Sequence, residues 1–166
     1  MLFRGFKEKS SNLYYIKVII QNKNIDNAII DFVVDTGSTL TIISVKDAIK
    51  LKLLSIDEKS FELISNFDLY KEKVQTTMGS MDLLKLDDVI LSFFFDNDKC
   101  YFAEYFDAIY IAKPAIRNEG DYKIIMTIPS VLGIDILRNY KIEFSNDMVM
   151  LERWLWLNTL NLLFAI

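Results

Sequence analysis

Short apolar runs separated by turn-forming residues dominate the pattern of this chain. Residues 13–20 and 28–34 are rich in β-branched and aromatic side chains, a composition that favours strands. No run before residue 153 keeps a 3.6-residue period over a helical length. The pattern therefore predicts an all-β barrel or sandwich. Further strands are expected at residues 40–43, 69–77, 80–95, 101–112, 123–128, 140–144 and 148–152.

Two short helices are expected between the strands. Ser44 can cap a helix that runs to about Leu51, because its hydroxyl can accept a hydrogen bond from an early helical N–H. Residues 134–139 are long enough for one or two further turns. Residues 1–11 are polar, and we expect them to be frayed. Residues 55–67 are mixed in character, and residues 113–122 are expected to form a polar loop.

The chain has the size and composition of one globular domain. It has 166 residues, of which 52% are hydrophobic, so it can bury a sizeable core. We expect a domain over residues 1–152 and an apolar C-terminal tail over residues 153–166. The net charge of −4 and the absence of a basic stripe argue against nucleic acid as a partner.

The residue inventory excludes several kinds of chemistry. The chain has no histidine, which excludes Ser-His-Asp and Cys-His catalysis and most zinc enzymes. Cys100 is the only cysteine, so neither an internal disulfide nor a multi-cysteine zinc site can form. We expect no cofactor and no metal. The first residues lack the apolar segment of a secretory signal, so we expect a cytoplasmic protein.

The stretch over residues 29–44 carries the candidate chemistry. An apolar strand leads into Asp35, Thr36, Gly37 and Ser38, and a second apolar strand follows. A carboxylate between two such strands is costly unless it is paired or neutralised. Gly37 permits a tight turn, and two hydroxyls flank the carboxylate.

Two further elements follow at a distance along the chain. Val131 and Leu132 precede Gly133, and a short helix comes next. A glycine at that place lets a strand pass closely beneath a loop. Residues 75–80, with Gly79 near the middle, lie between two expected strands and suit the tip of a hairpin.

In this order, the three elements resemble those of the retropepsin-like aspartic protease family, in its single-domain prokaryotic and cellular branch. The resemblance covers about residues 13–152 and implies a closed retropepsin-like β-barrel, the acid protease fold, with one or two short helices. The residues after Gly133 correspond to the helix that follows the late signature of the family, and residues 75–80 to its flap. The resemblance implies two sets of site residues: catalytic Asp35, Thr36 and Gly37, and substrate-binding Ser38, Thr77, Met78, Gly79 and Val131.

One Asp-Thr-Gly per chain supplies only half of a two-carboxylate site. A homodimer with a twofold axis would place Asp35 against its own copy. Two such carboxylates share one proton, so that one can activate a water and the other can donate to the scissile carbonyl. The resemblance implies that the Thr36 hydroxyls bond across this dimer and that the substrate is an extended polypeptide. The expected activity is that of an aspartic endopeptidase.

Other interpretations remain beside this one. The chain could be a catalytically weak peptide-binding or dimerisation module with the same fold. Asp31 and Asp35 could suggest a metal pair, but a strand separates them by about 13 Å and a solvated position for Asp31 is favoured. A phosphatase motif of the Asp-x-Asp-Gly-Thr type would need a second aspartate two residues after the first, and the sequence has Gly37 at that position.

The tail over residues 154–166 is apolar on most sides. As a helix it would span about 20 Å, which is too short to cross a bilayer of about 30 Å. Burial in the dimer or against the barrel is favoured. Association of Trp154–Ile166 with a membrane surface is the alternative, and only Arg153 would support it with charge.

Overall fold

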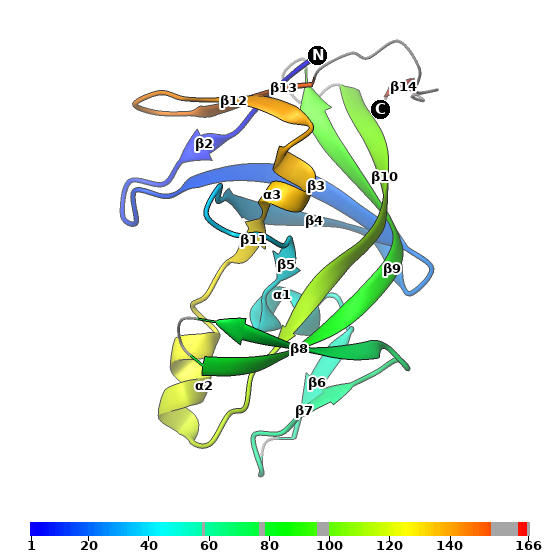
Figure 1. The fold of residues 1–166 in the computed structure, drawn as a ribbon, viewed down its shortest axis with the longest axis vertical. Helices are drawn as coiled ribbons and strands as arrows, with labels where there is room; N and C mark the ends of the chain where they lie inside the picture. Colours follow the sequence, from blue (N-terminus) through cyan, green and yellow to red (C-terminus); the bar gives the residue numbers. More distant parts are fainter. Residues whose placement is uncertain (58, 77–78, 96–99, 154–162, 166) are drawn as a thin grey trace.

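The computed structural model describes residues 1–57, 59–76, 79–95, 100–153 and 163–165. Strands make up most of this chain, and three short helices join them (Figure 1). Six strands form a closed ring, because β9 pairs with both β3 and β10 while the order β10-β5-β11-β4-β3 completes the circle. The all-β barrel expected from the sequence is confirmed. The ring consists of β3 (Tyr14–Asn22), β4 (Ile25–Val34), β5 (Ile42–Ile43), β9 (Gly79–Phe95), β10 (Cys100–Lys113) and β11 (Ser130–Leu132).

The remaining strands extend this ring or lie at its ends. β8 (Tyr70–Thr76) pairs with the first part of β9, β14 (Leu163–Ala165) pairs with the start of β10, and β2 (Phe6–Lys7) pairs with β3. A three-stranded sheet at one end has the order β1-β13-β12, and β6 and β7 lie at the opposite end (Figure 1). Their bounds are β1 (Leu2–Arg4), β13 (Val149–Arg153), β12 (Tyr140–Phe144), β6 (Leu54–Ile56) and β7 (Leu63–Ser65).

The helices are α1 (Val45–Lys50), α2 (Glu119–Ile125) and α3 (Ile134–Leu137). The expected cap of α1 is confirmed, because the Ser44 hydroxyl accepts a hydrogen bond from the N–H of Asp47. Helix α3 follows Gly133 as expected. Among the described residues, no helix combines the length and the apolar character needed to cross a bilayer.

The strand expected over residues 123–128 is wrong, because residues 123–125 form the end of α2 and residues 126 and 127 form a turn. The Asn118 side chain accepts a hydrogen bond of 2.9 Å from the N–H of Asp121 and caps the helix. No residue of α2 is buried. The β-branched side chains of Ile124 and Ile125 favour a strand only where they pack on a sheet, so the cap decides the outcome here.

The expectation that residues 1–11 are frayed is also wrong. Phe3 in β1 is completely buried, and its ring centroid lies 5.4 Å from that of Phe93 and 6.0 Å from those of Phe102 and Tyr140. The apolar run of Met1, Leu2 and Phe3 is too short to give a periodic signal. The partners of Phe3 come from distant strands, so only the assembled barrel shows its role.

A partly buried charge cluster ties the terminal sheet to β10. The Glu104 carboxylate accepts hydrogen bonds from the Arg153 guanidinium and from the Tyr140 hydroxyl. Burial, and then the nearby Glu104, raise the pKa of Tyr140, so its hydroxyl remains a proton donor. Arg153 is the last residue of β13 and also donates its backbone N–H to the carbonyl of Met1. The division between a domain over residues 1–152 and a tail over residues 153–166 stays a prediction.

We expect Phe3→Ala to lower the free energy of unfolding by about 3–5 kcal/mol, because it leaves a cavity among four aromatic rings. Phe6→Ala is the matched control, since Phe6 is 44% exposed and its loss should cost less than about 1.5 kcal/mol. Urea denaturation followed by tryptophan fluorescence measures both. Equal effects of the two substitutions would contradict the packing of β1 described here.

Candidate active site

Strand β4 delivers Asp35 to the surface from a rigid base. Val33 and Val34 are buried and lie between β3 on one side and β11 on the other, where they pair with Val131 and Leu132. The N–H of Asp35 then donates to the carbonyl of Leu132 at 3.2 Å. The backbone of Asp35 is therefore held by β11, although its side chain is exposed.

The loop after β4 folds back onto Asp35. The N–H of Gly37 donates to Asp35 Oδ1 at 2.8 Å, and the N–H of Ser38 donates to the Asp35 carbonyl at 3.2 Å. A Cβ at position 37 would lie 3.2 Å from Asp35 Oδ1, so the glycine leaves room for its own hydrogen bond to the carboxylate. Within the part of the chain that the structure describes, Asp35 Oδ2 has no hydrogen-bond partner.

Strand β11 and the start of α3 pass directly beneath this loop. A Cβ on Gly133 would lie 2.4 Å from both the carbonyl carbon and the oxygen of Leu40. The expectation that a side chain there would collide with the loop is confirmed. The N–H of Ile134 donates to the Ser38 carbonyl at 2.8 Å, so the same approach that demands glycine also anchors the far side of the loop.

A buried threonine completes the link between loop and helix. Thr41 is fully buried, and its N–H and hydroxyl donate to the two carboxylate oxygens of Asp135 at 2.8 Å and 2.7 Å. Its hydroxyl oxygen also accepts from the N–H of Gly133 at 3.0 Å. No local sequence pattern points to Thr41, because its partners lie more than 90 residues away along the chain. Asp135, in the first turn of α3, binds the loop strand through Thr41.

The catalytic candidates are brought together at one exposed loop. Asp35, Thr36 and Gly37 are all exposed, and Ser38 is half-buried with its hydroxyl on the Leu40 carbonyl at 2.8 Å. The Thr36 hydroxyl makes no hydrogen bond to any described residue of its own chain. It is therefore available to a partner, and its expected role across a dimer stays a prediction.

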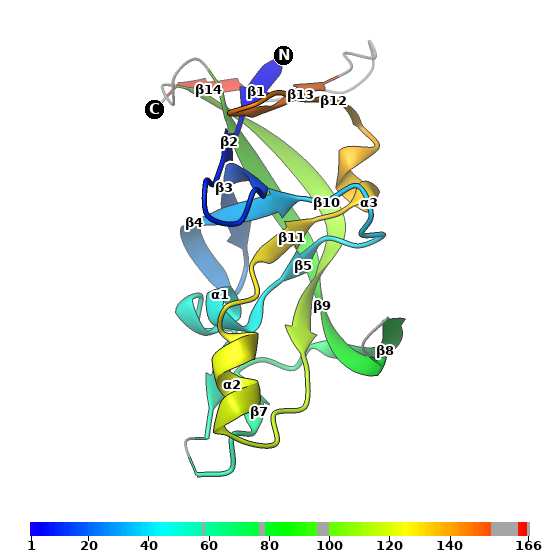
Figure 2. The same ribbon diagram turned by 90° about the vertical axis from the view of Figure 1, so that its left-hand side faces the viewer.

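The structure describes only some of the predicted substrate-binding residues. Val131 is half-buried between Val33 and Ile42 on the neighbouring strands. Gly79 begins β9 and pairs with Thr76, as a hairpin requires, whereas Thr77 and Met78 lie outside the described residues. β8 is an edge strand of the sheet, and in Figure 2 it lies on the same side of the barrel as the loop after β4.

The acidic residues near this loop do not form a metal site. Asp31 is exposed on β4, as expected, and both oxygens of Asp135 are engaged by Thr41. No group of three His, Cys, Asp or Glu residues suited to a metal ion occurs in the portion of the chain described by the structure. A hollow of about 580 Å³ lies elsewhere, against α1 and β4, and none of residues 35–38 lines it.

Solved structures that are similar to this chain include two proteases. A retropepsin-like aspartic protease from Rickettsia conorii is 16% identical, with 91% of this chain and 90% of that chain covered and a TM-score of 0.49. EIAV protease in complex with the inhibitor HBY-793 is 12% identical, with 80% and 91% covered and a TM-score of 0.43. No protein-family model matches the sequence, and no curated protein matches it. The Rickettsia protein is of the family that the motifs resemble, and neither similarity bears on the activity of Asp35.

We expect Thr41→Val to lower the free energy of unfolding by about 1–3 kcal/mol, because the Gly133 N–H and Asp135 Oδ1 lose a buried partner while the side-chain volume is kept. Thr39→Val is the matched control, since Thr39 is exposed in the same loop and should change stability by less than about 0.5 kcal/mol. Chemical denaturation measures both. A Thr41→Val protein as stable as the Thr39→Val protein would show that this cross-link does not hold the loop.

Proposed function

We propose that the protein is an aspartic endopeptidase that acts as a homodimer, with one Asp35 from each chain. The observation that carries the proposal is the state of Asp35 itself. Its backbone is fixed by β11, one carboxylate oxygen accepts the Gly37 N–H, and the other oxygen has no partner among the described residues. An exposed carboxylate whose backbone is fixed in this way can work together with a second carboxylate that lies close to it.

A second Asp35 would supply that group. Two close carboxylates cannot both ionise, so the pair holds a single proton and titrates as a unit. The ionised carboxylate accepts a proton from water as the water attacks the peptide carbonyl, and the protonated carboxylate donates its proton to the carbonyl oxygen. Carboxylates and water suffice for this chemistry.

The substrate of such an enzyme would be an extended polypeptide. β8 offers a free edge, and a peptide can add to such an edge through backbone hydrogen bonds. Ser38 and Val131 would lie beneath the peptide, and the hairpin of β8 and β9 would cover it as a flap, with Thr77, Met78 and Gly79 at its tip. In this arrangement, half-buried Val131 favours apolar side chains next to the cleaved bond.

The competing function is that of a peptide-binding or dimerisation module with little hydrolysis. The same open edge and the same loop would serve it. The two functions differ only in whether Asp35 does chemistry, so one substitution separates them.

We expect the wild-type protein to cleave an unfolded protein substrate at acidic pH and Asp35→Asn to abolish the cleavage, because an amide can neither accept the proton of water nor share one with a second carboxylate. Asp107→Asn is the matched control, since Asp107 is exposed on β10 and should leave the rate unchanged. Gel electrophoresis and mass spectrometry of the fragments measure the cleavage.

Sedimentation of the same proteins tests the dimer. If Asp35→Asn retains wild-type cleavage, the endopeptidase proposal fails. If wild type and variant bind an unfolded protein equally and cleave none of it, the module is the correct function.

A further inference from the structure

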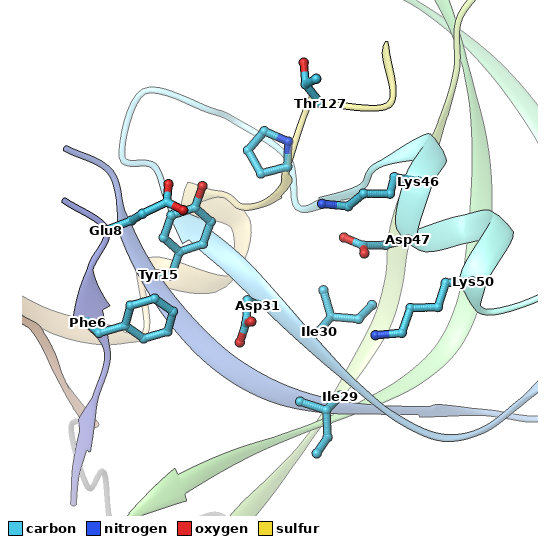
Figure 3. A pocket seen from close by; sticks show the side chains of 11 residues that line it. Phe6, Glu8, Tyr15, Ile29, Ile30, Asp31, Lys46, Asp47, Lys50 and Thr127 are labelled. Atoms are coloured by element: carbon cyan, nitrogen blue, oxygen red, sulfur yellow. The ribbon is translucent and has the colours of Figure 1, made fainter. Parts of the chain in front are cut away.

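A hollow of about 580 Å³ opens between α1, β4 and the first strands of the chain, away from the Asp35 loop (Figure 3). Its volume falls within the range of about 300–1,000 Å³ that is typical of small-molecule sites. Side chains of opposite charge line it together with two aromatic rings. Its lining consists of Phe6, Glu8, Tyr15, Ile29, Ile30, Asp31, Lys46, Asp47, Lys50, Thr127 and Pro129.

Asp47 is a buried carboxylate that is held in place and points into this hollow (Figure 3). The residue is only 9% exposed, and its Oδ2 accepts hydrogen bonds from the hydroxyls of Ser130 at 2.6 Å and Ser44 at 3.2 Å. Its Oδ1 accepts no hydrogen bond from any residue that the structure describes. Asp47 Oδ1 is not among the buried atoms of the described residues that lack a partner, so it is open to the hollow, where a cationic group of a ligand can reach it and form a charge-assisted hydrogen bond.

Two lysines flank Asp47 on the same wall. Lys46 and Lys50 extend from α1 into the hollow, one on each side of the Asp47 carboxylate (Figure 3). Neither forms an ion pair with a described carboxylate, and like charges four residues apart on a helix repel each other. An anionic group of a ligand would relieve this repulsion.

The opposite wall is aromatic and acidic. The rings of Phe6 and Tyr15 stack with centroids 5.7 Å apart and an interplanar angle of 17°. Ile29, farther along β4, is 49% exposed. Burial, and then the nearby Glu8, raise the pKa of Tyr15, so its hydroxyl stays available as a donor. Asp31 adds a further exposed carboxylate. This wall offers an apolar surface and further negative charge.

We propose that this hollow binds a zwitterion with an apolar side chain, either a short peptide with free ends or a free amino acid. Asp47 Oδ1 accepts the ligand's ammonium group, Lys46 and Lys50 bind its carboxylate, and the stacked rings of Phe6 and Tyr15 contact its side chain. The proposal is independent of the endopeptidase function.

The charges of the lining favour this ligand over simpler ones. A phosphate or another purely anionic ligand would meet the carboxylates of Glu8, Asp31 and Asp47, and a purely cationic ligand would meet two lysines. The hollow does not offer the oxygen ligands that a divalent metal needs, because no suitable group of three His, Cys, Asp or Glu residues occurs among the described residues. A ligand that carries both charges satisfies both sets of groups.

Titration calorimetry on the Asp35→Asn protein tests the proposal without cleavage of the ligand. The probes are the tripeptide alanyl-phenylalanyl-alanine, its N-acetyl form, its C-terminal amide and free phenylalanine. We expect the tripeptide or phenylalanine to bind one per chain, and loss of either terminal charge to weaken binding about tenfold or more. Tighter binding of the tripeptide identifies a peptide site, and tighter binding of phenylalanine identifies an amino-acid site.

Variants assign the two ends of the ligand. In the Asp35→Asn background, Lys46→Gln with Lys50→Gln should weaken the free tripeptide about tenfold and leave the affinity of its amide unchanged. Lys59→Gln is the control, because Lys59 is exposed and lies outside the hollow, so it should change nothing. Asp47→Asn should remove the preference for a free amine, with circular dichroism as the check on folding. Absence of binding at millimolar ligand, or equal binding of blocked and free forms, overturns the proposal.

Discussion

The close approach of Gly133 to Leu40 is the constraint on which the geometry of the Asp35 loop depends. Only a glycine allows α3 to begin directly under the loop, because a Cβ there would lie 2.4 Å from the backbone of Leu40. That approach brings Asp135 to Thr41 and the Ile134 N–H to the Ser38 carbonyl. The loop is thereby fixed from below, so Asp35 can remain exposed without being free to move.

The barrel holds in place the two strands that support this loop. β4 carries Asp35, β11 carries Gly133, and the two pair in parallel within a closed ring of strands. The buried network of Ser44, Asp47 and Ser130 joins α1 to the start of β11. The strands that frame the candidate active site therefore cannot shift independently of each other. Among the described residues no second carboxylate joins Asp35, and we propose that another copy of the chain supplies it.

Much of this arrangement can be predicted from local sequence, and the features that cannot be predicted share one physical reason. The strands on either side of Asp35, the Ser44 cap and the need for glycine at position 133 follow from side-chain composition and backbone sterics. Phe3 and Thr41 could not be found in that way, because their roles come from residues that are distant in the sequence. The strand preference of Ile124 and Ile125 pointed to a strand where α2 forms. The cap at Asn118 outweighed this preference, because the two side chains are not buried against a sheet. Thr77 and Met78 lie outside the described residues, so their roles at the flap stay predictions.

The central claim is that Asp35 works only against its own copy, and mixing two proteins tests it most directly. Wild-type protein is combined with a ninefold excess of Asp35→Asn, unfolded, refolded together and assayed for cleavage of an unfolded substrate. Random pairing leaves about a tenth of the wild-type chains with a wild-type partner, so activity per wild-type chain should fall to about a tenth. Unchanged activity per wild-type chain would show that one Asp35 suffices and would contradict the shared site.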